Sequence, residues 1–241
     1  MDKYDIYNAH KAWVIAQTEI KTEDFAQRMI FSLDIVQGFY GIKDNTMFIA
    51  FQGSADYRDV LSDLDAFMVS LDGAKVHFGF YKQYKRIESY IDNLVNPNID
   101  KPVSTDQTNL NSSFESDKKS AQRVIFSGQS LGGAIAIIAS YIIKKKYPKL
   151  EISTVTFGTP KVGNQEFVNA FKRKNIEIKQ YIYKDDIIPR LPFKIVGYRE
   201  TSEPIYFGEY KWYEKILHII TQFTGNPFNH GWKNYKDEFV L

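Results

Sequence analysis

Between residues 123 and 183 the chain alternates short apolar strands with helices, and this order constrains the fold more than any other feature. Strands are predicted at Arg123–Ser127, Ile152–Phe157 and Ile176–Tyr183, and helices at Leu131–Lys146 and Gly163–Lys174. Strands joined by crossover helices lie parallel in one sheet, with the helices packed on its faces. The second half of the chain therefore predicts a parallel sheet flanked by helices, the arrangement of an α/β protein.

The first half of the chain predicts further helices and one hairpin. Apolar residues at helical spacing predict helices over Ile6–Ile20 and Gly79–Val95, and a further helical piece over Phe25–Phe31. Two alternating segments, Ile35–Ile42 and Met47–Phe51, flank a turn and predict an antiparallel pair. The remaining predictions are a strand at Val76–Phe78, a hairpin of Ile195–Glu200 with Pro204–Phe207, and helices at Lys211–Phe223 and His230–Phe239.

Residues 96–122 break this pattern. They hold scattered apolar residues and many turn formers, which is typical of a long, flexible surface insert rather than a linker between domains. A chain of 241 residues is long enough to bury a large core. We therefore expect a single domain over residues 1–241, with the insert at about 96–122.

Composition excludes several classes of function. With 31 Lys and Arg against 29 Asp and Glu, the formal charge of +2 gives no dense basic face for nucleic acid. The absence of Cys excludes disulfides, Cys-ligated metals and a Cys nucleophile. The longest nearly apolar run, Ala134–Ile143, is too short for a transmembrane segment, and the N-terminus does not resemble a signal peptide. The expectation is a soluble protein, with a cytoplasmic location favoured.

The first of the three strands runs into its helix through Gly128-Gln129-Ser130-Leu131-Gly132, a G-x-S-x-G motif. A serine on a sharp strand-to-helix turn projects its hydroxyl above the sheet, and flanking glycines let the strand and helix approach closely. The backbone N–H of Leu131 lies at the helix N-terminus, where negative charge is stabilised. The motif predicts Ser130 as a nucleophile; the alternative is a glycine-rich turn whose serine has no chemical role.

A serine nucleophile needs a general base, and the chain offers four histidines. In this kind of site the chain order is serine, acid, histidine, which disfavours His10 and His77; His77 is predicted to be a structural hydrogen-bonding residue. His218 lies in an amphipathic helical pattern, where a histidine is more often packed or exposed than catalytic. His230 lies at a loop-to-helix junction, where catalytic residues are frequent. We predict His230 as the base, with His218 as the alternative.

The acid that orients the base is expected just after a strand that follows the motif. Asp185 and Asp186 both follow the strand that ends at Tyr183, so both are candidates. Their position does not choose between them, and the first of the two has the alternative role of a solvated turn residue.

Further segments stand in order along most of the chain: Phe51–Ser54, Asp59–Leu64, Val76–Phe80, Gly128–Gly133, Thr156–Asn164, Asp186–Pro192 and His230–Tyr235. The first six resemble F-R-G-S/T, D-W-x-x-D-L, V-H-x-G-F, G-H-S-L-G-G, T-F-G-x-P-R-V-G-N and D-x-V-P-x-L-P, and the last resembles the closing histidine segment, of the class 3 lipases, the fungal triacylglycerol lipase-like branch of the α/β-hydrolases. The resemblance implies an α/β-hydrolase fold with a central, mostly parallel sheet, flanking helices and a short lid. It also implies a carboxylic ester hydrolase that acts on lipids as a serine esterase.

The resemblance assigns further roles. It selects Asp186 over Asp185, because the acid of the family stands three residues before a proline. It makes Ser54, together with the backbone N–H of Leu131, the oxyanion hole, and residues 55–62 the lid region. An acyl groove would be lined by apolar side chains, for which the candidates are Tyr57, Phe80, Ile187, Leu191 and Phe193; for each of them ordinary core packing is the alternative.

The expected reaction is transfer of an acyl group from an ester to Ser130 and then to water, without a metal or cofactor. Gln129 and Gln52 stand where the family has His and Arg, and neither belongs to the triad, so we expect activity to survive. Val60 stands where many relatives carry Trp, which tilts the expected substrate toward smaller esters. The expected partners are lipid or other ester substrates and, transiently, a lipid interface; nucleic acid is not expected.

Several functions remain compatible with these residues. A phospholipase A1, a monoacylglycerol lipase, a short-chain carboxylesterase and a feruloyl-type esterase would share the triad. A non-catalytic lipase-like scaffold that binds a lipid or a protein is the alternative from another class. The retained Ser, Asp and His, in the expected order, argue against that scaffold.

Overall fold

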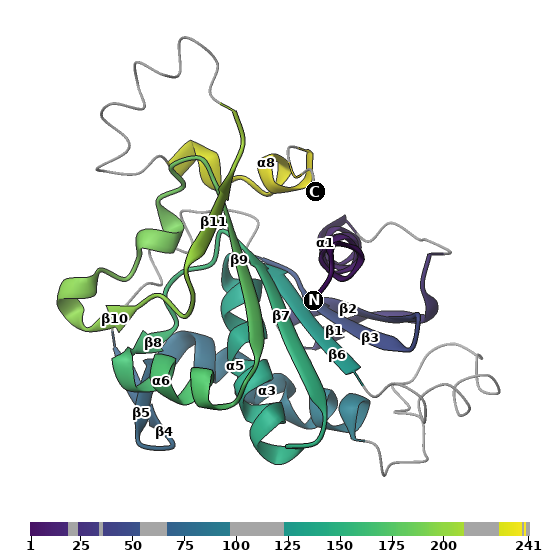
Figure 1. Cartoon of the computed structure of the whole chain (residues 1–241), viewed down its shortest axis with the longest axis horizontal. Helices are drawn as coiled ribbons and strands as arrows, with labels where there is room; N and C mark the ends of the chain where they lie inside the picture. Colours follow the sequence, from purple (N-terminus) through teal and green to yellow (C-terminus); the bar gives the residue numbers. More distant parts are fainter. Residues whose placement is uncertain are drawn as a thin grey trace.

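The computed structural model describes residues 1–18, 24–33, 36–53, 67–96, 123–209, 227–237 and 239. Within these residues the larger of two sheets has seven strands in the order β1-β2-β3-β6-β7-β9-β11 (Figure 1). The strands are β1 (Ala26–Leu33), β2 (Val36–Lys43), β3 (Thr46–Phe51), β6 (Arg123–Gln129), β7 (Glu151–Phe157), β9 (Glu177–Tyr183) and β11 (Pro204–Phe207). From β3 to β11 all neighbours are parallel, and β1 and β2 extend the sheet as antiparallel strands. The predicted mostly parallel sheet is confirmed.

Helices cover both faces of this sheet. On one face lies α1 (Lys3–Thr18), whose Trp13 is fully buried and stacks obliquely on Phe157 of β7. On the other face lie α3 (Phe78–Val95) and α5 (Leu131–Lys146). Helix α5 is apolar on nearly all sides because it packs against both the sheet and α3. None of the helices in the described part of the chain combines the length and apolar character needed to cross a membrane.

A second, smaller sheet lies beside the ends of these helices. It has the order β10-β8-β5-β4 and contains β4 (Met68–Leu71), β5 (Ala74–His77), β8 (Gly163–Asn164) and β10 (Tyr198–Arg199). Helix α6 (Gln165–Arg173) follows β8 directly. The remaining elements are the short helices η1 (Ile188–Arg190), η2 (Lys194–Val196), η3 (Pro227–His230) and α8 (Trp232–Asp237).

Two predictions from the sequence are wrong. Residues 25–31 were predicted as a helix, but 26–33 form β1, because the segment pairs with β2 along its length. The hairpin of 195–200 with 204–207 does not form: Tyr198–Arg199 pairs with β8, and Pro204–Phe207 pairs in parallel with β9. In the first case antiparallel pairing with the next strand overrides the helical spacing. In the second case pairing with strands distant in the sequence, β8 and β9, decides the arrangement, and a local pattern does not show it. Of the predicted insert at about 96–122, residues 97–122 lie outside the described residues, as does the predicted helix at 211–223.

The other predicted elements are present, with ends shifted by a few residues. The hairpin of β2 and β3 is antiparallel as predicted, and the strands and helices between 123 and 183 follow the predicted order. The carboxyl ends of β3, β6, β7 and β9 meet at one edge of the sheet. In open parallel sheets this edge is where functional loops gather. The turns after these strands contain Gly53, Ser130, Gly158 and Asp186.

Candidate active site

Ser130 occupies the turn between β6 and α5 with a strained backbone. Its φ of 55° and ψ of −124° lie outside the regions that non-glycine residues normally adopt. The Ser130 N–H donates to the carbonyl of Phe157 at 2.9 Å, which ties the turn to the end of β7. The strand–turn–helix setting predicted for this serine is therefore present.

Two glycines allow this turn to form. An added Cβ on Gly128 would lie 2.4 Å from the carbonyl carbon of Gly132, and one on Gly132 would lie 2.4 Å from the carbonyl oxygen of Phe51. Both distances are far below van der Waals contact. The motif therefore needs glycine at these positions because the backbones of β3, β6 and α5 approach one another closely.

Asp186 and His230 form a buried pair across the same edge of the sheet. The His230 Nδ1 lies 2.8 Å from Asp186 Oδ2, and the residues are 4% and 1% exposed. With the proton on Nδ1, the ring donates to the carboxylate and leaves Nε2 free to accept a proton. Asp186 makes this contact although Asp185 is also buried, so the geometry agrees with the choice of Asp186.

Ser130 is fully buried, and its hydroxyl has no hydrogen-bond partner in the part of the chain that the structure describes. The structure therefore joins Asp186 to His230 but does not join Ser130 to either by a hydrogen bond. Hydrogen bonds between catalytic groups are often long without substrate and tighten only in the complex.

The Asp186 carboxylate has two further donors. The Ile188 N–H donates to Oδ1 at 2.9 Å, and the Tyr235 hydroxyl donates to Oδ2 at 2.5 Å. Tyr235 is fully buried, and its burial, together with the nearby carboxylate, raises its pKa well above the usual value. The phenol therefore stays neutral and donates to Asp186. Sequence analysis missed this residue, although it ends the segment that resembles the closing histidine motif.

Tyr235 is itself held from the opposite side. The His10 Nε2–H of α1 donates to the Tyr235 carbonyl at 2.9 Å, and the Tyr183 N–H donates to the Tyr235 hydroxyl oxygen at 3.0 Å. Burial lowers the pKa of His10, so its ring is neutral at pH 7. His10, which chain order disfavours as a base, thus supports the residue that contacts the candidate acid.

Gln129 connects the turn to the candidate base. Its Nε2 donates to the main-chain carbonyl of His230 at 2.8 Å, and both residues are buried. Gln129 is the residue that departs from the family pattern just before the serine. Its amide fixes the His230 backbone relative to Ser130, a role that the sequence did not indicate.

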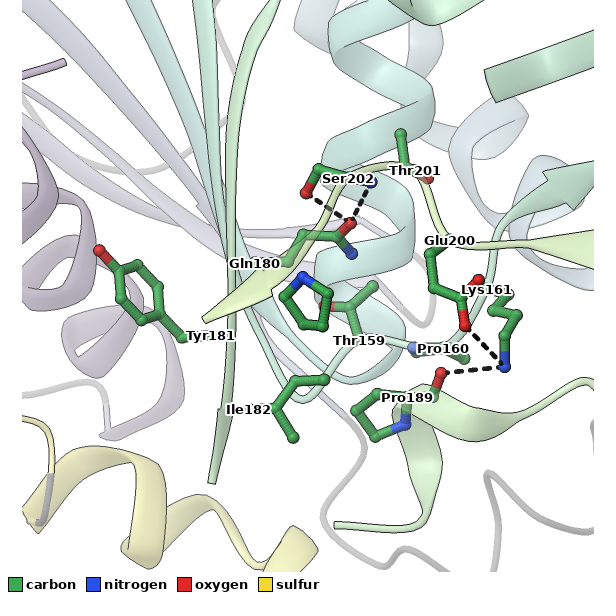
Figure 2. Close-up of a pocket in the computed structure, with 11 residues that line it drawn as sticks. Thr159, Pro160, Lys161, Gln180, Tyr181, Ile182, Pro189, Glu200, Thr201 and Ser202 are labelled. Atoms are coloured by element: carbon green, nitrogen blue, oxygen red, sulfur yellow. Dashed lines mark hydrogen bonds and ion pairs between the residues drawn. The ribbon is translucent and has the colours of Figure 1, made fainter. Parts of the chain in front are cut away.

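Lys161 ties down the segment that follows Asp186. Its Nζ donates to the carbonyls of Pro189 and Arg190 and lies 3.9 Å from a Glu200 oxygen (Figure 2). Burial lowers the pKa of Lys161 to about 8. A small cavity of about 20 Å³ lies beside it, lined also by Gln180. That volume matches about one water molecule, so the cavity has no room for an acyl chain.

The predicted oxyanion-hole residues are described in part. Leu131 is the first residue of α5, where backbone N–H groups lack an intrahelical partner. The backbone of Gly53 lies close to Gln129: a Cβ added to Gly53 would be 2.7 Å from the Gln129 carbonyl oxygen. Ser54, the predicted lid at 55–62 and Tyr57 lie outside the described residues.

The predicted substrate-lining residues lie in different surroundings. Phe80 is buried in the core and stacks on His77, with ring centres 4.0 Å apart. Ile187 packs against the buried pair Ile188 and Leu191. Phe193 is 60% exposed. A groove that joins these residues stays a prediction.

The predictions for His77 and His218 can also be compared with the structure. His77 caps the N-terminus of α3, where its Nδ1 accepts from the Phe80 N–H at 3.4 Å, so it has the structural role expected of it. His218 lies outside the described residues.

Curated relatives match a large part of this chain. Over 163 residues it is 29% identical to a lipase of Rhizopus niveus; the matched region covers 65% of this chain and 37% of that protein. Over 172 residues it is 29% identical to secreted mono- and diacylglycerol lipase 1 of Fusarium solani, which covers 68% of this chain and 46% of that protein. The match spans less than half the length of these relatives.

These relatives correct one expectation. The sequence favoured a cytoplasmic location because its N-terminus does not resemble a signal peptide. The Fusarium solani relative is named as a secreted lipase, which contradicts that expectation. The N-terminal residues were the wrong basis for an argument about location.

The fold is also that of a solved lipase. A triacylglycerol lipase described as having a serine protease triad at its catalytic centre superposes with a TM-score of 0.72 at 20% identity, over 94% of this chain and 91% of that one. This likeness confirms the α/β-hydrolase fold. The family model described as lipase (class 3) matches residues 48–196, more than half of the chain, and this span contains Ser130 and Asp186. The chain therefore belongs to the class 3 lipase family.

Proposed function

We propose that this protein hydrolyses carboxylic esters of lipids through an acyl-enzyme formed on Ser130. The observation that carries the proposal is the buried Asp186–His230 pair, 2.8 Å apart, at the same sheet edge as a serine with a φ of 55°. Membership of the class 3 lipase family supports the same reaction.

In the proposed mechanism His230 Nε2 takes the Ser130 proton while the oxygen attacks the ester carbonyl. Asp186 holds the imidazole with its proton on Nδ1 and stabilises the imidazolium that forms. The tetrahedral intermediate collapses, the C–O bond to the alcohol breaks, and His230 protonates the departing alcohol. Water, deprotonated by the same ring, then attacks the acyl-enzyme and releases the carboxylic acid and free Ser130.

The negative oxygen of each intermediate needs donors. We assign this role to the backbone N–H of Leu131 at the start of α5 and to Ser54. The helix N-terminus favours negative charge there. Loss of one such donor costs about 3 kcal/mol of transition-state stabilisation in a serine protease of another fold.

Substrate and partners follow from the same chemistry. The proposed substrates are lipid esters, met at a lipid interface or dispersed in water. With a formal charge of +2, the chain has no charge excess for nucleic acid. We also propose that residues 1–241 form one domain.

Hydrolysis of p-nitrophenyl esters from acetate to palmitate tests the proposal. Ser130→Ala should abolish turnover, while Ser140→Ala is the matched control, because the Ser140 hydroxyl in the same helix bonds only within the core. The chain-length profile separates a long-chain lipase from a short-chain carboxylesterase, and phospholipids and monoacylglycerols extend the panel. Wild-type turnover no higher than the uncatalysed background, even with detergent or an emulsion present, would instead favour a lipase-like scaffold that binds without catalysis.

A further inference from the structure

The segment between η1 and β10 lies at the periphery of the molecule (Figure 1). Ile195 is 94% exposed, and its neighbours Phe193 and Val196 are 60% and 49% exposed. Large apolar side chains exposed together are unusual on a protein surface unless they meet a partner. We name Phe193, Ile195 and Val196 the apolar tip.

The apolar surface continues from the tip onto β4. An added Cβ on Gly197 would lie 3.5 Å from the Met68 methyl, so Met68 lies at the base of the tip. Phe67, which precedes Met68, is 63% exposed and packs edge-on against the exposed ring of Phe78, with ring centres 5.9 Å apart. A pair of exposed aromatic rings therefore begins at the residue before Met68, which lies at the base of the apolar tip.

Cations flank the apolar tip along the sequence. The segment 190–200 holds Arg190, Lys194 and Arg199 against the single acid Glu200, which gives 3 − 1 = +2. The Lys194 side chain is 64% exposed, although it pairs with Glu200 at 3.1 Å. An apolar tip with cations at its base matches a lipid surface whose headgroups carry negative charge.

The tip is held at a fixed place relative to the candidate active site. Lys161 binds the Pro189 and Arg190 carbonyls, and its backbone N–H donates to the Leu191 carbonyl at 2.7 Å. The segment that starts at Asp186 is therefore anchored just before the tip begins. A surface docked on the tip would lie at a constant position with respect to Asp186.

We propose that the apolar tip inserts into anionic lipid–water interfaces and docks the protein on them. The choice of occupant rests on the proposed function, because a hydrolase of lipid esters meets its substrate at such an interface. The apolar tip with Met68, Phe67 and Phe78 amounts to six side chains, which is few against the roughly 20 residues that a stable protein interface takes from each partner. Insertion of a few apolar groups into the headgroup boundary needs far less area.

Vesicle flotation with the 241-residue Ser130→Ala protein tests this docking. Ser130→Ala keeps lipid hydrolysis out of the measurement, so a failure of docking is distinct from a failure of the proposed function. Vesicles of phosphatidylcholine alone are compared with vesicles that contain about 30% phosphatidylglycerol. The double substitution Ile195→Ser and Val196→Ser should lower the bound fraction about tenfold. Lys194→Gln should reduce the difference in bound fraction between vesicles with and without phosphatidylglycerol.

Matched variants make the result specific. Tyr4→Ser removes a side chain that is 73% exposed on α1, away from the tip, and should bind vesicles like the parent protein. With Ser130 restored, the double variant should hydrolyse dissolved p-nitrophenyl acetate at the parent rate. Its turnover of emulsified long-chain esters should fall. Ile195→Trp should bind vesicles more tightly than the parent.

Two results would overturn the proposal. One is equal vesicle binding by the parent and the double variant, including no binding by either. The other is a fall in sedimentation coefficient on Ile195→Ser without lipid, which would assign the tip to contact between two copies of the chain.

Discussion

The Tyr235 hydroxyl lies 2.5 Å from Asp186 Oδ2, the oxygen that also faces His230. Because burial keeps this phenol neutral, it always donates to the carboxylate. Tyr235→Phe should lower kcat for ester hydrolysis about tenfold to a hundredfold, the range for a lost hydrogen bond to a charged group, with KM little changed. Steady-state kinetics on a p-nitrophenyl ester measures this.

The control for this change is Tyr141→Phe, which removes a hydroxyl bonded to Asp72 at 3.3 Å on another part of the molecule. It should leave kcat unaltered. If Tyr235→Phe also leaves kcat and its pH profile unaltered, Tyr235 does not position Asp186.

Gln129 offers a second test of positioning. Its side chain donates to the His230 carbonyl at 2.8 Å, so Gln129→Met should loosen the His230 backbone. We expect kcat to fall about tenfold because the imidazole no longer stays aligned with Ser130. Gln180→Met, which removes an acceptor of Ser202 hydrogen bonds away from the triad, should keep full activity. Equal kinetics in the two variants would refute this role.

Glycine in the turn has a consequence for stability. Gly132→Ala would place a Cβ 2.4 Å from the Phe51 carbonyl oxygen, where only backbone can move. The free energy of unfolding should fall by about 3 kcal/mol or more. In Gly79→Ala the nearest atom, at 3.1 Å, belongs to the His77 ring, so the loss should be smaller. Urea denaturation compares the two, and similar losses would show that the close approach at Gly132 is not limiting.

His10 predicts an acid dependence of stability. Burial lowers its pKa in the folded protein from the usual 6.5, so below pH 6.5 the unfolded state binds more protons. Stability should therefore be complete above pH 6.5 and fall as the pH drops below it, by up to about 1.4 kcal/mol per pH unit from this residue. His10→Gln, which keeps a donor for the Tyr235 carbonyl, should show a shallower decline in urea denaturation between pH 7.5 and 5.5. An identical decline would exclude His10 as its source.

Much of the fold follows from local patterns. The elements between Arg123 and Tyr183 alternate strictly, and parallel crossovers leave few arrangements for such an order. Residues 25–31 were predicted as a helix, but pairing with β2 makes the segment a strand. Residues 204–207 were predicted correctly as a strand but with the wrong partner, because a local pattern carries no information about pairing with β9.

In the candidate site, too, some residues could be predicted from the sequence and others could not. Ser130 and His230 were predicted from a motif and from chain order, and Asp186 was selected by the resemblance to the class 3 lipases. Tyr235 and Gln129 act through contacts between segments far apart in the chain, over 49 and 101 residues. Such contacts exist only in the folded protein, which is why the sequence did not reveal them.

Reaction with a fluorophosphonate tests the central claim that Ser130 is a nucleophile activated by His230 and Asp186. Intact-protein and peptide mass spectrometry should find one adduct, on Ser130, with the labelling rate reduced at least about a hundredfold in His230→Ala. His218→Ala should be labelled at the wild-type rate. An adduct on another residue, or labelling of Ser130 that is unchanged in His230→Ala and lost in His218→Ala, would contradict the account.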